Sequence, residues 1–440
     1  MNKLRNIKPF FRKFKRLVGS ELIYIGSDIL IKAIGFISMP FFLNAMSPGE
    51  FGEFNLYMTY KNIFTIFIGL NVSNAIVRYY VDKASEDRKY LATALWIIAI
   101  GGSLFSGLIL SLNYIFNFLN IGINALIVVL ISTAFNCFAN VGREVLRSEK
   151  NHISYGATSV LNSLISTSLG LILVYFMDND LAFWRIVSVA IASIITGTLL
   201  TLRIIKTDGI KGNANTAKYL LSYSIPLIPY TLSTTILSQV NKIFLSTISL
   251  EEVGIFSFAS NLAMIIYIIA IALNRSLQPY VFEALRDNKD TFSRMKRNTV
   301  IFYLFYILFI SGTDILIWIF GNTDYYGATK VIPILILAYG YFFLYSLYVN
   351  YLYYYKKNYA ISLFSILSAV VALVANYFLI TPLGYFGAAI ATLLAYFSLF
   401  VFGYISVTKG LAIRIISTKK LVLVQVLMIV PVLVKIFIGG

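Results

Sequence analysis

The sequence predicts an all-α, polytopic membrane protein with about 12 transmembrane helices. Three observations predict it. Hydrophobic residues make up 59% of the chain and charged residues 12%, about half the charged share of a soluble domain. Apolar stretches of about 20–27 residues, each long enough to cross a hydrocarbon core, follow one another from about 21 to 407. Nearly every Lys and Arg lies in every second gap between these stretches.

Length and low charge predict twelve spans. In chain order they are 21–46, 51–77, 91–112, 121–142, 154–177, 181–202, 219–247, 253–282, 298–320, 328–352, 358–380 and 384–407. A further apolar stretch, 421–438, contains Pro431 and Lys435. It is either a thirteenth span or a re-entrant segment.

The N-terminal 20 residues carry seven Lys and Arg residues. Phe10, Phe14 and Leu17 share one helical face, which predicts a basic amphipathic helix on the cytoplasmic leaflet. A disordered basic tail is the alternative. A removable signal peptide is not expected, because no apolar core or small-residue cleavage site follows the charges.

The distribution of basic residues predicts the orientation. The N-terminal tail and alternate loops hold 29 of the 36 Lys and Arg residues, whereas the loops between them hold only Lys330. Basic loops stay in the cytoplasm. We therefore expect a protein of the bacterial inner (plasma) membrane with a cytoplasmic N-terminus.

A short internal repeat predicts two halves of the same orientation. Residues 46–54 read MSPGEFGEF and residues 248–256 read ISLEEVGIF, with four identities at an offset of 202. Six spans per half is an even number, so the halves would be parallel repeats, as in some transporters. The predicted parts are a basic segment 1–20, a six-helix bundle 21–202, a cytoplasmic linker 203–218, a second six-helix bundle 219–407 and a basic segment with the possible extra membrane segment, 408–440. Gly, Asn and Lys make the linker the expected flexible connector.

Composition excludes several functions. Cys137 and His152 are the only residues of their types, so neither an intrachain disulfide nor a multi-cysteine or multi-histidine metal site is possible. No phosphate-binding glycine loop is present, and we expect no cofactor. The basic residues flank apolar spans rather than forming one patch, so we expect a membrane partner and no nucleic acid. The short outer loops argue against an enzyme and leave a secondary transporter, channel or flippase.

Basic side chains inside spans mark cavities or pathways by default. Lys32 lies near the middle of the first span, and it either faces a water-filled cavity or pairs with Asp28 four residues earlier. Lys61 in the second span either lines a cavity or extends its ammonium group to the interface. Arg78 and Arg275 lie near the inner ends of equivalent helices. They form a basic collar at the inner mouth, or they are ordinary anchors.

Two further groups of residues are candidates for coupling and gating. Asp314 is isolated within its span and, with Asp28, is a candidate for ion coupling; a hydrogen-bonded structural role for Asp314 is the alternative. Pro226 and Pro229 each remove a backbone hydrogen bond from the seventh span. Their kink is either part of a gate or static.

Three tyrosines share one face of the tenth span and are candidates for stacking against sugar rings: Tyr341, Tyr345 and Tyr348. Aromatic faces pack against sugar C–H surfaces while hydroxyl groups donate and accept hydrogen bonds. Helix packing is the alternative use of these side chains, and we favour it.

Long runs that open the two halves carry a resemblance to a known family. They are GFISMPFFLNAMSPGEFGEFNLY and GLNVSNAIVRYYVD in the first half and LLSYSIPLIPYTLSTTILSQVNKIFLSTISLEEVGIF in the second. Through these runs the chain resembles the polysaccharide (O-antigen) flippase family, Wzx-like, of the multidrug/oligosaccharidyl-lipid/polysaccharide exporter superfamily.

This resemblance implies a MATE-like pair of six-helix bundles that work by alternating access. The implied substrate is an undecaprenyl-diphosphate-linked oligosaccharide, the repeat unit of O-antigen, capsule or exopolysaccharide, moved from the cytoplasmic to the outer leaflet. A polysaccharide polymerase and a chain-length regulator are the implied protein partners. The family also implies a cationic cavity, for which Lys32, Lys61, Arg78 and Arg275 are the candidates. It often has an acidic residue near QVNKIF, where this chain has Asn241.

Three rival functions remain open. A lipid II flippase would share the cationic cavity and would differ in substrate and usually in having two extra helices. A cation-coupled multidrug exporter of the same fold would prefer acidic residues in its cavity, whereas the charges within these spans are mainly basic. A polysaccharide polymerase is disfavoured by the short outer loops. Neighbouring glycosyltransferase genes would favour the glycan flippase.

Overall fold

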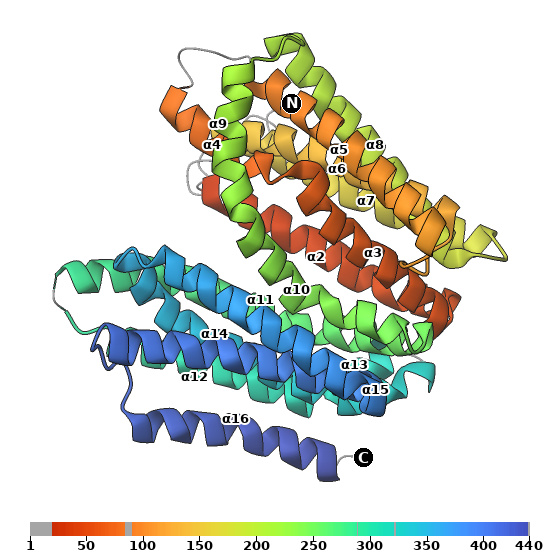
Figure 1. Cartoon of the computed structure of the whole chain (residues 1–440). Coiled ribbons are helices and arrows are strands. Elements are labelled where there is room, and N and C mark those ends of the chain that lie inside the picture. Colours follow the sequence, from red (N-terminus) through yellow and green to blue (C-terminus); the bar gives the residue numbers. More distant parts are fainter. Residues whose placement is uncertain (1–19, 84–89, 288, 321–322, 439–440) are drawn as a thin grey trace, which may run out of the picture. The chain divides into compact units, whose positions relative to one another are not determined.

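The computed structural model describes residues 20–83, 90–287, 289–320 and 323–438, and the regular elements of these residues are all helical (Figure 1). The α-helices are α2 (Ser20–Ala45), α3 (Pro48–Gly69), α4 (Val72–Lys83), α5 (Tyr90–Phe116), α6 (Ile123–Ser148), α7 (His152–Phe176), α8 (Leu181–Asp208), α9 (Ala214–Ser224), α10 (Ile228–Ser246), α11 (Leu250–Arg286), α12 (Phe292–Ser311), α13 (Thr313–Phe320), α14 (Ile332–Tyr354), α15 (Asn358–Ile405) and α16 (Thr418–Ile438). Shorter turns are η1 (Ile225–Leu227), η2 (Thr323–Lys330) and η3 (Ser406–Gly410). Apart from Ser20, the predicted amphipathic segment 1–20 lies outside the described residues.

The prediction of an all-α membrane protein is confirmed. Among the described residues, ten helices are long and apolar enough to cross a membrane, or up to twelve if each of two bent pairs is one span. The stretch predicted as a thirteenth span or a re-entrant segment is one of these ten, as the helix Lys419–Phe437. Helix α15 contains two predicted spans, 358–380 and 384–407, which meet at a non-helical Gly384.

Two predicted spans are broken rather than straight. The stretch 51–77 is divided into α3 and α4, which are bent by 43°. The break falls at Leu70 and Asn71, two consecutive residues with positive φ that cannot continue a right-handed helix. The stretch 298–320 is divided at Gly312 into α12 and α13, bent by 59°.

The helices form two compact units. The first comprises the chain up to Ala45 and Tyr60–Ile228; the second comprises Met46–Thr59 and Pro229–Gly440. These units differ from the predicted halves at two places. The start of α3 groups with the second unit, and residues 219–228 group with the first.

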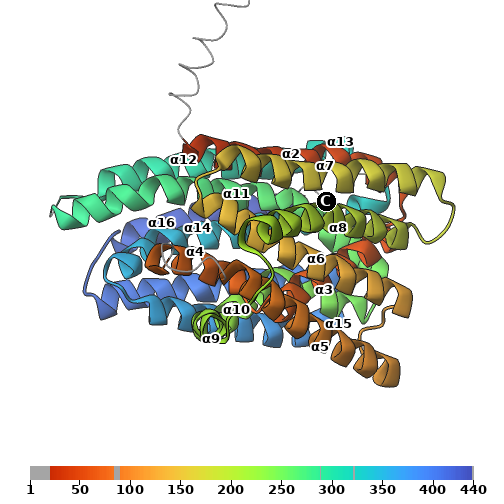
Figure 2. The same ribbon diagram turned by 90° about the horizontal axis from the view of Figure 1, so that it is seen from above.

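In the first unit, α8 packs against α6 and α7, and α7 packs against α2 (Figure 2). The predicted flexible linker, 203–218, is mostly helical because it continues α8 and begins α9. Its non-helical part is bound to α5: the Trp96 indole donates to the Ile210 carbonyl at 2.9 Å, and the Asn213 amide donates to the Thr93 hydroxyl at 2.9 Å. The chain therefore passes between units not in this linker but next to Pro226 and Pro229, where α9 ends and η1 intervenes.

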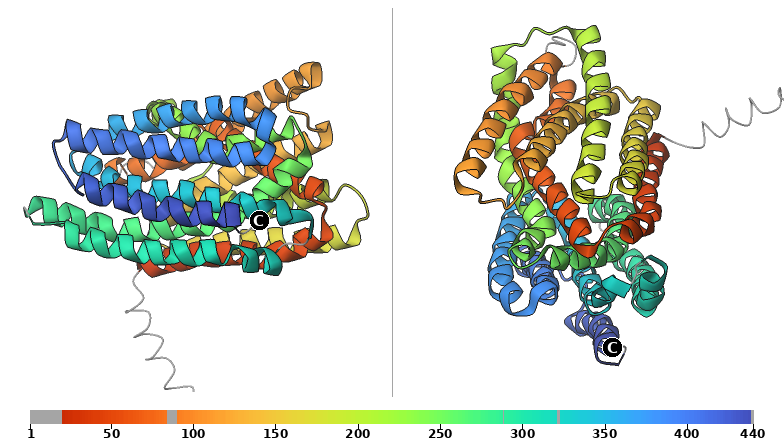
Figure 3. Two further views of the ribbon diagram at one scale, coloured as in Figure 1. Left: turned by 90° about the horizontal axis from the view of Figure 1, so that it is seen from below. Right: turned by 90° about the vertical axis from the view of Figure 1, so that its right-hand side faces the viewer.

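In the second unit, α14 is the central helix and packs against α11 and α15. It is apolar on all sides and buried along nearly its whole length, as expected of a helix surrounded by others. Helix α16 lies at the edge of this unit against α12 and α14 (Figure 3). The Tyr303 and Tyr306 hydroxyls of α12 donate to the Leu427 and Met428 carbonyls of α16, at 3.1 and 2.8 Å.

The repeated segments begin α3 and α11, each with a serine as N-cap. The Ser47 hydroxyl accepts from the Glu50 amide at 3.3 Å, and the Glu50 carboxylate accepts from the Ser47 amide at 2.9 Å, which is a capping box. At the equivalent position the Ser249 hydroxyl accepts from the Glu251 amide at 3.1 Å. Both segments belong to the second unit.

Candidate functional site

Three cations lie close together inside the first unit. Lys61 of α3 is only 7% exposed. Arg143 of α6 and Arg185 of α8 are near enough for their charges to act on it. Like charges repel strongly in a medium of low dielectric constant, so this arrangement needs compensating groups.

Arg185 has its compensation within the protein. Its guanidinium group donates to the Ser166 carbonyl at 2.9 Å and to the Ser188 hydroxyl at 2.7 Å, and it lies 4.5 Å from the centre of the Phe42 ring. Gly170 leaves room for it, because a Cβ there would lie 2.7 Å from the guanidinium nitrogen. We interpret Arg185 as a structural residue.

Neither Lys61 nor Arg143 forms an ion pair among the described residues, although the charge of Glu144 acts on Arg143. Arg143 donates to the Asn140 amide oxygen at 2.5 Å and the Asn136 amide oxygen at 3.4 Å. Glu144, the next residue, pairs with Arg147 at 3.5 Å. Neutral amides solvate a guanidinium group but do not cancel its charge, so this part of the first unit retains a net positive charge suited to an anion.

The predicted pair of Asp28 and Lys32 is not formed. Both side chains are exposed on α2, and no ion pair joins these two described residues. The charge of Asp28 acts instead on Tyr155 of α7. Lys32 is therefore available to an anion from outside the unit.

Arg78 and Arg275 differ in their surroundings. Arg78 of α4 pairs with Asp82 at 2.9 Å, and the Tyr219 hydroxyl of α9 donates to the same carboxylate at 2.7 Å. Arg78 thus stabilises the contact between α4 and α9. Arg275 is exposed on α11 of the second unit. The basic collar of these two arginines stays a prediction.

The second unit encloses a polar and aromatic cavity of about 460 Å³. Helices α10, α11, α14 and α15 supply its walls. Six tyrosines line it: Tyr230, Tyr267, Tyr339, Tyr345, Tyr353 and Tyr396. Hydroxyl and amide side chains complete the polar part: Thr234, Ser238, Gln239, Ser260, Asn261, Asn274, Ser346 and Ser365. Lys242 is the one charged residue among those that line this cavity.

The three tyrosines predicted to stack against sugars divide between two roles. Tyr345 lines the cavity. Tyr341 packs against α15, 4.9 Å from the ring centre of Phe397. Tyr348 also packs against α15, 5.6 Å from the ring centre of Tyr404. The contacts of Tyr341 and Tyr348 agree with the helix-packing alternative, because these two side chains of α14 pack against α15 rather than line the cavity.

Sequence reasoning missed most of this cavity. Lys242 is a basic residue within the predicted span 219–247, but its neighbours in the sequence give no sign of a pocket. Tyr339 and Tyr345 are six residues apart, a spacing that does not place them on one narrow helical stripe. The cavity joins side chains from four helices, so no single stretch carries its signature.

Asp314 is not isolated. Its carboxylate accepts a hydrogen bond from the ammonium group of Lys435, so the pair joins α13 to α16. This contact agrees with the alternative that Asp314 is a hydrogen-bonded structural residue. Pro226 and Pro229 do interrupt the helix as predicted, since α9 gives way to η1 and then to α10; a gating role stays a prediction.

A buried network of neutral polar groups surrounds Asn241. Its amide nitrogen donates to the Ala388 carbonyl at 3.0 Å and to the Thr392 hydroxyl at 2.5 Å, while its amide oxygen accepts from Asn376 at 3.2 Å. A carboxylate at position 241 could not make the two donations. The network thus fits the asparagine that the chain has there.

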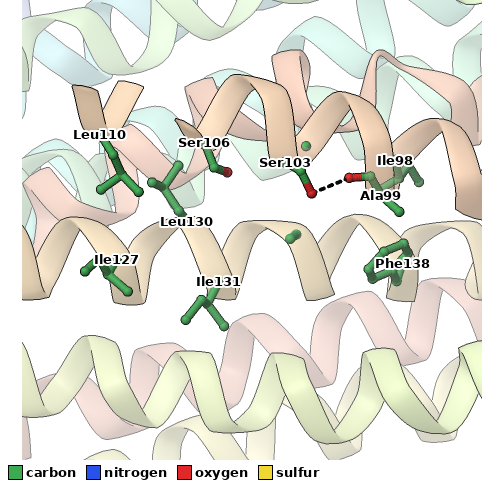
Figure 4. A pocket seen from close by; sticks show the side chains of 11 residues that line it. Ile98, Ala99, Ser103, Ser106, Leu110, Ile127, Leu130, Ile131 and Phe138 are labelled. Carbon is green, nitrogen blue, oxygen red and sulfur yellow. Dashed lines mark hydrogen bonds between the residues drawn. The ribbon is translucent and has the colours of Figure 1, made fainter. Parts of the chain in front are cut away.

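An apolar groove of about 350 Å³ lies between α5 and α6 of the first unit (Figure 4). Its walls include Ile98, Leu110, Ile127 and Phe138. The Ser103 hydroxyl donates to the Ala99 carbonyl of its own helix at 2.7 Å, so it presents little polarity to the groove. Such walls accommodate hydrocarbon rather than a polar head group.

Comparison with known proteins decides the family. The family described as "Polysaccharide biosynthesis protein" matches residues 18–285, more than half of the chain. The chain belongs to this family. The chain is 24% identical over 374 residues to an Lsg locus protein of Haemophilus influenzae, covering 80% of the chain and 88% of the relative. It is also 24% identical over 372 residues to an uncharacterized membrane protein of that species, covering 81% of the chain and 89% of the relative.

Solved structures share its fold. The lipid II flippase MurJ in an inward closed conformation superposes with a TM-score of 0.71 at 15% identity, over 94% of this chain and 97% of that one. An inward-facing MATE multidrug transporter superposes with a TM-score of 0.61 at 14% identity, over 87% and 94%. The chain therefore has a fold found in membrane transporters and flippases.

Proposed function

We propose that this protein is a flippase for a lipid-linked oligosaccharide. It moves an undecaprenyl-diphosphate-linked repeat unit of O-antigen, capsule or exopolysaccharide from the cytoplasmic to the outer leaflet of the plasma membrane. The family and the transporter fold support this proposal. A polar glycan does not cross hydrocarbon unaided, because each desolvated hydroxyl group costs several kcal/mol.

The observation that carries the proposal is the cluster of cations around Lys61 in the first unit, in which Lys61 and Arg143 form no ion pair among the described residues. Lys61 is buried, and Arg143 bonds only to amide oxygens. A buried charge without a partner is strongly destabilising. A diphosphate would compensate both cations, and exposed Lys32 would give the anion a first contact. Binding of this kind is strong enough to capture the head group and, with few cations, weak enough to release it.

The topology supports a mechanism and an orientation for this flippase. The charge distribution favours a cytoplasmic N-terminus, and the two units favour alternating access, with the helix break at Pro226 and Pro229 as a candidate hinge. Asp28 is the within-span carboxylate we propose for any ion coupling, since Asp314 is paired with Lys435. A polymerase and a chain-length regulator would be partners in the same membrane.

A lipid II flippase is the second candidate. The superposition on MurJ and the additional helix α16 favour it. A multidrug exporter is less well supported, because the buried charged residues in the described part of the chain are cations, which would repel cationic drugs. The glycan flippase and the lipid II flippase are distinguished by the substrate that each one moves.

Complementation tests the proposal. The gene is expressed in strains that lack their own glycan flippase and make defined repeat units, and in a strain depleted of its lipid II flippase. We expect surface glycan to return in the first strains and growth to fail in the second. Lys61→Met, Lys32→Ala and Arg275→Ala should abolish surface glycan at normal membrane levels, whereas Lys218→Met, an exposed lysine of α9, should not. Rescue of growth alone would assign lipid II as the substrate.

A further inference from the structure

We propose that the cavity of the second unit binds a sugar ring that carries a carboxylate, with Lys242 as its cation. The proposal rests on the proposed function for the source of that sugar, an acidic residue within the transported oligosaccharide. It adds a second, separate binding site to the cations of the first unit.

The cavity walls suit a sugar ring. Tyr267 packs with its ring centre 5.3 Å from that of Tyr339 and 4.5 Å from that of Phe342. Tyr396 continues the wall, 5.6 Å from Tyr339 and 5.9 Å from Phe342. Such a surface packs against the C–H face of a pyranose. The volume of about 460 Å³ falls in the range of small-molecule sites.

The polar groups suit sugar hydroxyls. The cavity combines serine and threonine hydroxyls with the amides of Gln239, Asn261 and Asn274, which both donate and accept hydrogen bonds. The Asn274 amide oxygen accepts from Asn350 at 2.7 Å, and this bond fixes its orientation. A few placed polar groups on an aromatic wall are what orients a ligand in such a site.

Lys242 determines the charge of the ligand. It is 8% exposed, and its ammonium group donates to the Asn55 amide oxygen at 3.4 Å. Among the ion pairs of the described residues none includes Lys242, and no acidic residue lines the cavity. A neutral sugar would leave this ammonium group uncompensated, whereas a sugar carboxylate would pair with it.

A diphosphate is a poorer match for this cavity. Phosphate groups are held by several charge-assisted donors, such as an arginine fork or the amides of a helix N-terminus. This cavity offers one lysine among six tyrosines. A single carboxylate on an otherwise neutral ring has the charge and the apolar face that this lining would recognise.

Binding of lipid-free sugars to the purified, detergent-solubilised full chain tests the inference. The probes are a uronic-acid disaccharide, the same disaccharide with the carboxylate reduced to a primary alcohol, and inorganic pyrophosphate, measured by calorimetry. We expect the acidic disaccharide to bind at least about tenfold more tightly than its neutral counterpart, the ratio that one retained ion pair of about 1.4 kcal/mol gives.

Variants locate the effect. Lys242→Gln should remove the preference for the acidic disaccharide over the neutral one, and Lys242→Arg should keep that preference. Lys330→Gln, which changes an exposed lysine, should leave the binding of both disaccharides unchanged. Equal binding of the two disaccharides to the wild-type protein overturns the proposal, whether or not the Lys242→Gln protein folds. If pyrophosphate displaces the acidic disaccharide from the wild-type protein, and binding of pyrophosphate is lost in Lys242→Gln, the site binds a diphosphate and the proposal is overturned. Because these probes carry no lipid, the result stands apart from whether the protein moves a lipid-linked glycan.

Discussion

Gly52 and Gly254 lie against each other's helices at equivalent positions of the internal repeat. A Cβ on Gly52 would overlap the Leu250 carbonyl oxygen and lie 2.7 Å from the Gly254 nitrogen, and a Cβ on Gly254 would overlap the Pro48 carbonyl oxygen. Backbone atoms cannot move aside as a flexible side chain can. The first turns of α3 and α11 therefore touch only because neither residue has a side chain.

We expect Gly52→Ala and Gly254→Ala each to lower the free energy of unfolding by about 1–3 kcal/mol, the range for overpacking. Thermal unfolding of the purified protein in detergent would measure the effect. The double variant should fall short of the sum, because both substitutions separate the same two backbones.

Gly35→Ala in α2 is the matched control, since a Cβ there would meet no atom within 4 Å. It should leave the melting temperature unchanged or raise it, as alanine is the better helix former. A melting temperature for Gly52→Ala equal to that of the control would contradict the close contact of the two repeats.

A second pair of glycines separates backbone conformation from crowding. Gly384 and Gly209 both have positive φ, 55° and 77°. A Cβ at Gly384 would lie 2.9 Å from the Glu252 carboxyl carbon, whereas one at Gly209 would meet no atom within 4 Å. The same Glu252 carboxylate accepts from the Tyr385 amide at 2.5 Å.

Alanine at either glycine should cost about 1–3 kcal/mol, because its φ and ψ angles together lie outside the regions open to residues with a Cβ. Gly384→Ala should cost more, because it also displaces the Glu252 carboxylate from the Tyr385 amide. Thermal unfolding compares the two variants. Equal losses would mean that the Glu252 contact contributes nothing to stability.

Two buried tyrosine hydroxyls should respond in opposite ways to removal. The Tyr306 hydroxyl donates to the Met428 carbonyl at 2.8 Å. The Tyr348 hydroxyl is buried and has no hydrogen-bond partner in the described part of the chain. Tyr306→Phe should therefore lose about 1 kcal/mol of stability, and Tyr348→Phe should be neutral or stabilising. Chemical or thermal unfolding measures both, and a larger loss for Tyr348→Phe would show that its hydroxyl has a partner.

The ion pair of Asp314 and Lys435 makes a double-mutant cycle informative. We expect Asp314→Asn and Lys435→Met to be destabilising separately and to show a coupling energy of about 0.5–1 kcal/mol together. Glycan export by Asp314→Asn should persist, because the carboxylate stabilises the packing of α16. Loss of export in Asp314→Asn with full export in Lys435→Met would instead identify Asp314 as an ion-coupling residue.

The sequence predicts the positions of the helices better than it predicts which distant residues contact one another. The spans follow from length and hydrophobicity, which are local properties. The break at Leu70 and Asn71 escapes prediction, because leucine with positive φ gives no compositional signal. The linker near Gly209 looks flexible in composition, yet Trp96 and Thr93 of a distant helix hold it.

The candidate sites show the same limit. Lys61 is predictable because a cation within a span is costly wherever the helix packs. For other charged residues the partner that decides the role comes from another helix: Arg185 of α8 donates to Ser166 of α7, and Asp314 of α13 pairs with Lys435 of α16. The repeat motif did carry three-dimensional information, since its two copies contact each other.

Transport by the purified protein tests the central proposal most directly. The wild-type protein and Lys61→Met are reconstituted into vesicles that contain a fluorescent undecaprenyl-diphosphate-linked oligosaccharide. The rate at which an added, membrane-impermeant glycosidase gains access to inner-leaflet glycan is then measured. We expect rapid access with the wild-type protein and the rate of protein-free vesicles with Lys61→Met. A wild-type rate equal to that of protein-free vesicles would contradict the proposal.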